Sequence, residues 1–141
     1  MKRLIFSIGL AACLFSLPAF ASDKNIPEVM SSFFQTFRNA QDVNWTEVDD
    51  MLRIGFTLNG HSQFAYYSNN ELVVVAKEIK MEELPLTLKT QLAEYKGYVV
   101  SHVYELVKDN VKEYCAVLDS PSKHIALKGK KAWKRYLDER N

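Results

Sequence analysis

The chain has 141 residues, with 18 basic and 17 acidic side chains and 48% hydrophobic residues. This length fits one domain and excludes a multidomain enzyme or a nucleotide-binding fold with a separate substrate domain. The composition is that of a globular protein, neither disordered nor collagen-like. Because the net charge is close to zero, attraction to nucleic acid or to an acidic membrane would need a local basic patch.

Residues 1–21 predict a secretory signal peptide. Lys2-Arg3 forms a positive start, an apolar stretch runs from Leu4 to Leu17, and Ala19-Phe20-Ala21 fits a cleavage site. As a helix this stretch would span about 21 Å, which is less than the roughly 30 Å core of a bilayer. We therefore expect cleavage near Ala21, no membrane span, and a protein that is periplasmic or secreted.

A lipoprotein is the alternative at this end of the chain. Leu10-Ala11-Ala12-Cys13 resembles a lipoprotein-processing sequence, which would place a lipid on Cys13. The following segment, Leu14 to Ala21, is nearly all apolar and would make a poor tether. The sequence therefore favours a cleaved signal peptide over lipidation.

The remainder, residues 22–141, predicts one domain made of two repeats, about 22–80 and 81–141. Ile26-Pro27 recurs as Leu84-Pro85, and Phe64-Ala65-Tyr66 recurs as Ile125-Ala126-Leu127, at spacings of about 58 to 61 residues. Such ordered recurrence indicates two copies of one structural unit.

Each copy opens with an amphipathic helix. Pro27 and Glu28 suit the first turn of the first helix, and Pro85 and Gly97 bracket the second. Apolar residues at helical spacing predict the side chains that face the core. They are Ile26, Met30, Phe33, Phe34 and Phe37 in the first copy, and Leu84, Leu88, Leu92 and Tyr95 in the second.

After each helix the apolar period changes to two, which predicts four antiparallel strands. Asp49-Asp50, Asn59-Gly60 and Asn69-Asn70 predict tight turns in the first copy. In the second copy we expect strands near 98–107, 111–119, 123–128 and 131–137. The predicted fold class is α+β: two tandem units, each a helix plus a four-stranded antiparallel meander, forming one sheet with helices on one face.

A two-residue turn at Asn59-Gly60 would place Ile54 opposite Ala65. Because side chains alternate along a strand, this pairing assigns each strand residue to one of the two faces of the sheet. The face away from the helices, the helix-free face, would be largely apolar, whereas a face in water should be polar. We therefore expect a partner, a second copy or a ligand to cover it. The alternative is a one-residue register error in the second copy. The residues assigned to this face are Arg53, Thr57, Phe64, Tyr66, Val73, Val75, His102, Tyr104, Cys115, Val117, Ile125, Leu127 and Tyr136.

The ordered set of motifs resembles the PepSY-like, beta-lactamase-inhibitor-like (BLIP-like) domains of exported bacterial proteins. The residues that carry this resemblance are Ile26-Pro27-Glu28-Val29, Val43-Asn44-Trp45, Phe56-Thr57-Leu58-Asn59-Gly60, Ala65-Tyr66-Tyr67 and Leu84-Pro85. The chain departs from the family where Ser68-Asn69-Asn70-Glu71 replaces an Asp-x-x-Gly turn, and in the basic stretch from Lys128 to Arg135. The resemblance implies a concave sheet backed by helices, which in the inhibitor members grips another protein.

No catalytic motif is present, so we expect no enzymatic activity, no cofactor and no metal site. A metal or haem site at His102, Tyr104 and Cys115 is a weak alternative. The stretch from Lys128 to Arg135 surrounds Trp133 with cations, a pattern typical of anion or nucleic-acid contact. Protection of a terminal strand from aggregation explains these charges better, and we expect no nucleic-acid partner.

The sequence as a whole predicts an exported, non-enzymatic binding module, protein-binding or inhibitor-like, that uses the helix-free face. The expected partner is an unidentified envelope or secreted protein. The alternatives are a structural homodimer and a periplasmic protein that binds a small ligand or a metal. The predicted partner-binding residues are Phe64, Tyr66, Val73, Val75, Tyr104 and Tyr136.

Overall fold

The structure of the chain is a computed structural model that describes residues 25–140. The predicted signal peptide, its cleavage near Ala21 and the alternative lipid site at Cys13 lie outside the described residues. Among the residues that are described, no helix has both the length and the apolar character that crossing a bilayer requires.

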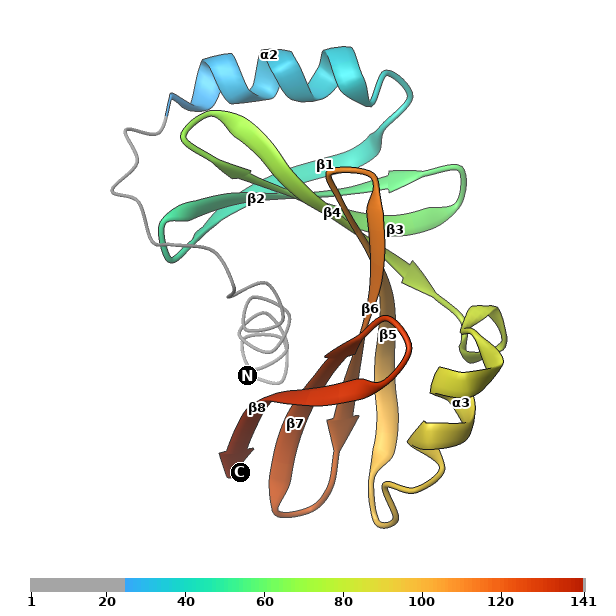
Figure 1. Cartoon of the computed structure of the whole chain (residues 1–141). Helices are drawn as coiled ribbons and strands as arrows, with labels where there is room; N and C mark the ends of the chain where they lie inside the picture. The colour runs from blue at the N-terminus through green and yellow to red at the C-terminus, as the bar shows by residue number, and fades with distance from the viewer. Residues whose placement is uncertain (1–24, 141) are drawn as a thin grey trace. The chain divides into compact units, whose positions relative to one another are not determined.

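The described chain contains two α-helices and eight strands, which follow one another in chain order in the sheet (Figure 1). The strand pairs whose register is known are antiparallel, so the predicted α+β class with an antiparallel sheet is confirmed. The tandem repeat stays a prediction. The elements are α2 (Ile26–Thr36), β1 (Gln41–Val48), β2 (Met51–Leu58), β3 (His61–Ser68), β4 (Glu71–Ile79), a 3₁₀ turn (Met81–Glu83), α3 (Leu86–Leu92), β5 (Val99–Lys108), β6 (Val111–Asp119), β7 (Lys123–Gly129) and β8 (Trp133–Arg140).

The chain divides into two compact units, each with a helix and a core of its own. The N-terminal unit comprises residues 25–77 and 106–111 of the described chain, and the C-terminal unit comprises residues 78–105 and 112–140.

In the N-terminal unit, α2 packs against the sheet through a narrow apolar stripe. The helix begins after Asn25, whose side chain accepts a hydrogen bond from the Glu28 N–H at 3.2 Å. Val29 and Phe33, one turn apart, are buried, whereas Phe34 is 46% exposed. The predicted core position of Phe34 is therefore wrong, because that residue lies about 100° further around the helix than Phe33.

The turns of the first copy form where the sequence predicts them. Asn59 and Gly60 both have positive φ, 52° and 78°, as a two-residue hairpin turn requires. This turn sets Ile54 opposite Ala65, which confirms the predicted register. The side chains that pack with α2 from the sheet are Leu52, Ile54, Phe56, Ala65 and Tyr67.

A β-bulge in β4 interrupts the alternation of faces. Tyr66 pairs with Val74, but the next residue along β3, Tyr67, pairs with Leu72. Val73 is therefore an extra residue without a cross-strand partner.

The bulge moves the later residues of β4 to the opposite faces from those predicted. Val75 pairs with Ala65, which packs with α2, so its predicted place on the helix-free face is wrong. Val74 and Ala76 take that place instead, and both are buried. The physical reason is that one inserted residue reverses the side-chain parity of a strand.

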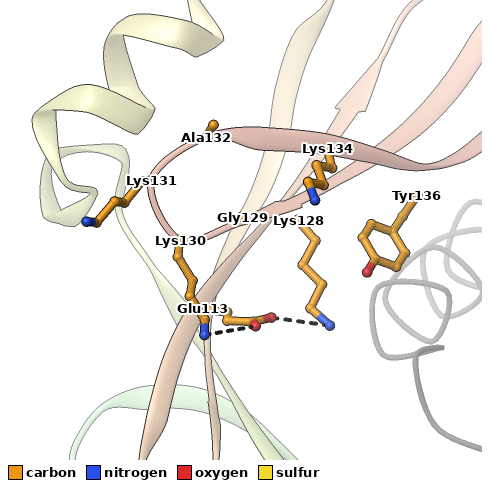
Figure 2. A pocket seen from close by; sticks show the side chains of 8 residues that line it. All are labelled: Glu113, Lys128, Gly129, Lys130, Lys131, Ala132, Lys134 and Tyr136. Carbon is orange, nitrogen blue, oxygen red and sulfur yellow. Dashed lines mark ion pairs between the residues drawn. The ribbon is translucent and has the colours of Figure 1, made fainter.

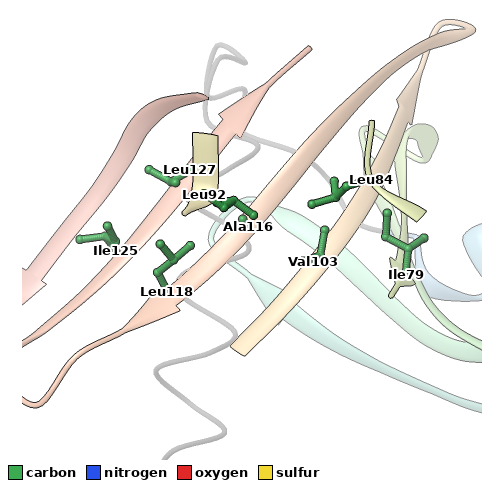
Figure 3. Packing of buried hydrophobic residues seen from close by; sticks show 8 residues of the cluster. All are labelled: Ile79, Leu84, Leu92, Val103, Ala116, Leu118, Ile125 and Leu127. Carbon is green, nitrogen blue, oxygen red and sulfur yellow. The ribbon is translucent and has the colours of Figure 1, made fainter. Parts of the chain in front are cut away.

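In the C-terminal unit, α3 is shorter than the predicted apolar stripe. The helix begins at Leu86 and ends at Leu92, and Leu84 reaches the core from the preceding 3₁₀ turn. Figure 3 shows the buried residues of this core, which are Ile79, Leu84, Leu92, Val103, Ala116, Leu118, Ile125 and Leu127.

The strand faces of the C-terminal unit correct a second part of the prediction. Leu118 pairs with Ile125 and Ala116 pairs with Leu127, and all four belong to the core that contains Leu84 and Leu92. Placing Ile125 and Leu127 on the helix-free face was therefore wrong. Ala65 of β3 and Ile125 of β7 are 60 residues apart, and each packs in the core of its unit. The repeat pattern in the sequence instead matched Ala65 with Ala126, which is 61 residues further along the chain.

The packing of α2 predicts a contrast between adjacent phenylalanines. Phe33→Ala removes a fully buried ring that lies 5.0 Å from the Phe56 ring. We expect this change to cost about 3–5 kcal/mol in the free energy of unfolding. Phe34→Ala should cost under about 1 kcal/mol, because Phe34 is half exposed. Urea denaturation of both variants tests this; equal losses would show that α2 does not pack through Phe33.

Candidate functional site

The helix-free face of the N-terminal unit is the side of its strands β1–β4 opposite α2. The register places on it the cross-strand pairs Arg53–Tyr66, Gly55–Phe64, Tyr66–Val74 and Phe64–Ala76. The side chains of these central pairs are aromatic and apolar apart from one guanidinium, whereas Asn44, Thr46, Thr57 and Ser62 lie around them on the same face. The centre of the face therefore differs from the polar face that an antiparallel sheet presents to water.

Arg53 and Phe64 are the half-buried residues at the centre of this face. The Arg53 guanidinium carbon lies 5.1 Å from the centre of the half-buried Phe64 ring, which is a cation–π contact. Gly55 lies opposite Phe64, and a Cβ there would come within 3.4 Å of the Phe64 ring and 3.0 Å of Asn44 Oδ1. The missing side chain at Gly55 therefore lets the ring and the Asn44 amide lie close to the backbone.

Tyr66 lies in the same face but is fully buried. Burial raises the pKa of the Tyr66 hydroxyl above its usual range, and the nearby Arg53 charge lowers it by less. Tyr104 in the C-terminal unit is also buried, at 1% exposure. Aspartate at either position would bury a carboxylate, so a loss of stability is expected along with any effect on binding.

Every second residue of β6 points away from the core that contains Leu84 and Leu92, and these residues mark the helix-free face of the C-terminal unit. They are Glu113, Cys115, Val117 and Asp119. The register sets Cys115 opposite Lys128, Val117 opposite Ala126 and Asp119 opposite His124. Cys115, Val117 and Ala126 are fully buried. This face therefore has an apolar centre with a charged group at each end.

A polar network surrounds Asp119 at one end of β6. The Ser101 hydroxyl donates a hydrogen bond to the Asp119 carboxylate, which also bonds to Nδ1 of the buried His124. His102 Nδ1 lies 2.9 Å from Glu78 Oε1, and the His102 ring stacks on Tyr104 at 6.1 Å.

The environment of Asp119 favours its charged form. Partial burial alone would raise the pKa of this carboxyl, but hydrogen bonds from Ser101 and His124 and electrostatic attraction to His124 and His102 outweigh it and lower the pKa. Because Ser101 bonds to the carboxylate, it is not paired with His124 as a nucleophile with its base would be. The network therefore has the form of a structural ion pair.

No group of side chains that could bind a metal ion is assembled within residues 25–140. In that part of the chain no three His, Cys, Asp or Glu side chains are grouped so that they could hold a metal ion. Of the residues that the sequence suggested for a metal or haem site, Tyr104 and Cys115 are buried.

A pocket of about 370 Å³ lies at the other end of β6, around the turn between β7 and β8 (Figure 2). Lys128 Nζ lies 3.2 Å from Glu113 Oε2, and Lys130 Nζ lies 3.8 Å from Glu113 Oε1. The Tyr136 ring lies 5.2 Å from Lys128 Nζ. The residues that line this pocket, hereafter the lysine pocket, are Glu113, Lys128, Gly129, Lys130, Lys131, Ala132, Lys134 and Tyr136.

A second β-bulge brings Tyr136 to this pocket. Ala126 pairs with Leu137 and Leu127 pairs with Arg135, which leaves Tyr136 without a cross-strand partner. Tyr136 is 40% exposed. Trp133, which the sequence grouped with the lysines as a contact residue, instead donates its indole N–H to the Leu88 carbonyl at 2.8 Å.

The predicted partner-binding residues thus occupy different environments. Phe64 is half-buried on the helix-free face, Tyr66 and Tyr104 are buried, Val73 is the extra residue of the β4 bulge, and Tyr136 lines the lysine pocket. Whether they contact a partner stays a prediction. The sequence placed Arg53 on the helix-free face but not among the contact residues, and it did not single out Glu113 or Asp119, because only strand pairing shows what these common charged residues face.

Comparison with known proteins identifies the fold. No family model and no curated protein matches the chain. Solved structures do match: a DUF2874 family protein from Bacteroides uniformis ATCC 8492 is 14% identical, with a TM-score of 0.68 over 80% of this chain and 87% of that one. A predicted periplasmic protein from Bacteroides eggerthii DSM 20697 is 13% identical, with a TM-score of 0.68 over 86% and 90%.

A BLIP-like protein from Bacteroides fragilis NCTC 9343 is 15% identical, with a TM-score of 0.62 over 90% of this chain and 89% of that one. At these identities the likeness shows the fold alone. The structural neighbours thus include DUF2874 family proteins and a BLIP-like protein, while the PepSY-like part of the resemblance stays a prediction.

The Asp119 network predicts a pH-dependent contribution to stability. A carboxyl with a lowered folded-state pKa stabilises the fold above its ordinary value of 3.8, and this contribution is lost as the pH falls through the folded pKa. We expect Asp119→Asn to destabilise the protein at neutral pH, with a difference from wild type that shrinks in acid. Urea denaturation of both proteins at pH 7 and pH 3 measures this difference in the free energy of unfolding.

Asp109→Asn is the matched control, because Asp109 lies in the β5–β6 turn and has a positive φ that asparagine adopts readily. It should change stability little at either pH. A difference between Asp119→Asn and wild type that is the same at both pH values would contradict the assigned role of the Asp119 charge.

Proposed function

We propose that this chain is an exported, non-enzymatic binding protein that holds a protein partner on the helix-free face of its sheet. The observation that carries the proposal is the aromatic and apolar centre of that face, with Phe64, Tyr66 and Val74 in positions where a sheet face in water carries polar groups. An apolar face of this kind is a common feature of protein interaction sites.

Arg53 and Phe64 are the contact residues that we place at the centre of the interaction. Aromatic and arginine side chains dominate the energetics of protein interfaces. Phe64 stands on a strand and packs against Gly55, so it loses little conformational freedom when a partner binds. Tyr66, which is buried, lies two residues after Phe64 on the same face of β3 and opposite Arg53 on β2.

The fold comparisons are compatible with this function at the level of analogy. One neighbour is a BLIP-like protein and another is a predicted periplasmic protein. An inhibitor-like mode and an envelope or secreted partner are therefore part of the proposal, by analogy of fold. The hydrogen bond from Ser101 to Asp119 supports the non-enzymatic part, because it withholds the serine proton from His124.

Site-specific photo-crosslinking in the native host tests the proposal. A photo-reactive phenylalanine analogue in place of Phe64 should form a covalent adduct with one protein partner. The matched control carries the analogue in place of Phe34, which is a half-exposed aromatic on the outer side of α2. It should form no such adduct.

The mass of the adduct distinguishes the alternatives. A product at twice the mass of the chain would favour the structural homodimer, and sedimentation at low concentration would then show a dimer. Equal crosslinking from positions 64 and 34, or none from position 64, would contradict the proposed face. Arg53→Glu should reduce the adduct at position 64, because it removes the cation that packs on the Phe64 ring.

A further inference from the structure

We propose that the lysine pocket of the C-terminal unit binds a phosphate-bearing anion. This inference is independent of the partner-binding face, because it rests on charges and contacts around the β7–β8 turn. Four lysines and one carboxylate line the pocket, so positive charge exceeds negative charge there.

The ion pairs of the pocket leave positive charge uncompensated. Glu113 is shared between Lys128, at 3.2 Å, and Lys130, at 3.8 Å, as Figure 2 shows. Within residues 25–140, Lys134 has no ion-pair partner. A single carboxylate therefore offsets part of the charge of several ammonium groups.

The pairing of β7 with β8 also places two positive charges opposite each other. Lys128 and Lys134 lie opposite each other on β7 and β8. Like charges at directly opposed positions destabilise an antiparallel pair. The Lys128 side chain is only 13% exposed, so water screens this repulsion less than it would at an open surface. An anion between the two strands would convert the repulsion into attraction.

The backbone around these lysines is held in place. A Cβ at Gly129 would come within 2.0 Å of the Ala132 carbonyl oxygen, so the turn closes tightly on a residue without a side chain. Gln91 of α3 donates to the Lys131 carbonyl at 3.1 Å and accepts from the Trp133 N–H at 3.2 Å. Lys130 and Lys131 therefore lie in a turn whose position is fixed before a ligand arrives, and Lys128 and Lys134 lie beside that turn.

Protection of an edge strand does not explain Lys128. Lys128 lies on β7, which pairs with both β6 and β8 and is therefore not an edge strand. Among the four lysines that line the pocket, Lys131 has a side chain that points away from Glu113 (Figure 2). Edge protection would also not require the exposed Tyr136 ring beside the Lys128 ammonium.

The composition of the pocket indicates the class of ligand. Lysine ammonium groups bind phosphate as point charges, and the Tyr136 hydroxyl can donate a further hydrogen bond. The four lysines outnumber the single carboxylate of Glu113, and attraction to this net positive charge grows with the charge of the ligand, so a group with two or more negative charges is favoured over a single carboxylate. A phosphate ester or a lipid phosphate headgroup would supply the same chemistry.

Isothermal titration of the purified protein with pyrophosphate tests the proposal at an ionic strength of about 0.15 M. We expect binding by the wild type and a loss of about tenfold or more in affinity for Lys134→Gln, as for other hydrogen bonds to charged groups. Lys112→Gln is the matched control, since Lys112 is an exposed lysine paired with Glu105 at 3.5 Å. It should bind like the wild type.

Lys134 is exposed and its removal relieves the repulsion with Lys128, so Lys134→Gln should unfold at an equal or higher temperature than wild type. This separates loss of binding from loss of fold. Glu113→Gln should tighten pyrophosphate binding, because the competing carboxylate is gone.

A second arm identifies the source of the phosphate. Phosphatidylcholine vesicles that contain phosphatidic acid are compared with vesicles that lack it, in a flotation assay. Binding to the former that depends on Lys134 but not on Lys112 assigns a lipid headgroup; binding of pyrophosphate with the same dependence assigns a free phosphate ester. No binding in either arm, or equal losses in Lys134→Gln and Lys112→Gln, would overturn the proposal.

Discussion

The alternation of side chains along the strands is the constraint on which both cores and both candidate sites depend. In each unit the core is built from apolar residues on the strand side that faces the helix, and their neighbours in the strand turn to the other side. One inserted residue reverses this parity. The bulges at Val73 and Tyr136 therefore decide which side chains of β4 and β8 reach which face.

The two bulges have different chemical consequences. In β4 the bulge brings Val74 and Ala76 to the side of Tyr66 and Phe64, which keeps the centre of the helix-free face of the N-terminal unit apolar. In β8 the bulge leaves Tyr136 unpaired and exposed beside Lys128. The same backbone irregularity thus completes an apolar platform in one unit and an aromatic wall of a charged pocket in the other.

Charged groups in the C-terminal unit are arranged along one face rather than scattered. Asp119 at one end of β6 is hydrogen-bonded by Ser101 and His124, and Glu113 at the other end is shared by two lysines. The first carboxylate is satisfied by its neighbours, which suits a structural role. The second is outnumbered by ammonium groups, which suits an anion site. This contrast depends on the positions of the charges, since the whole chain is nearly neutral.

The sequence by itself determined the α+β class, the start of α2, and the turns at Asn59-Gly60 and Asn69-Asn70, because capping and turn chemistry act over a few residues. It also predicted the pairing of Ile54 with Ala65, which a two-residue turn sets locally. Tertiary structure alone decided the faces of Val75, Ile125 and Leu127 and the convergence of Glu113, Lys128 and Lys134. The reason is that bulges and the contacts of α3 with the β7–β8 turn depend on packing between segments far apart in the chain, which local periodicity does not encode.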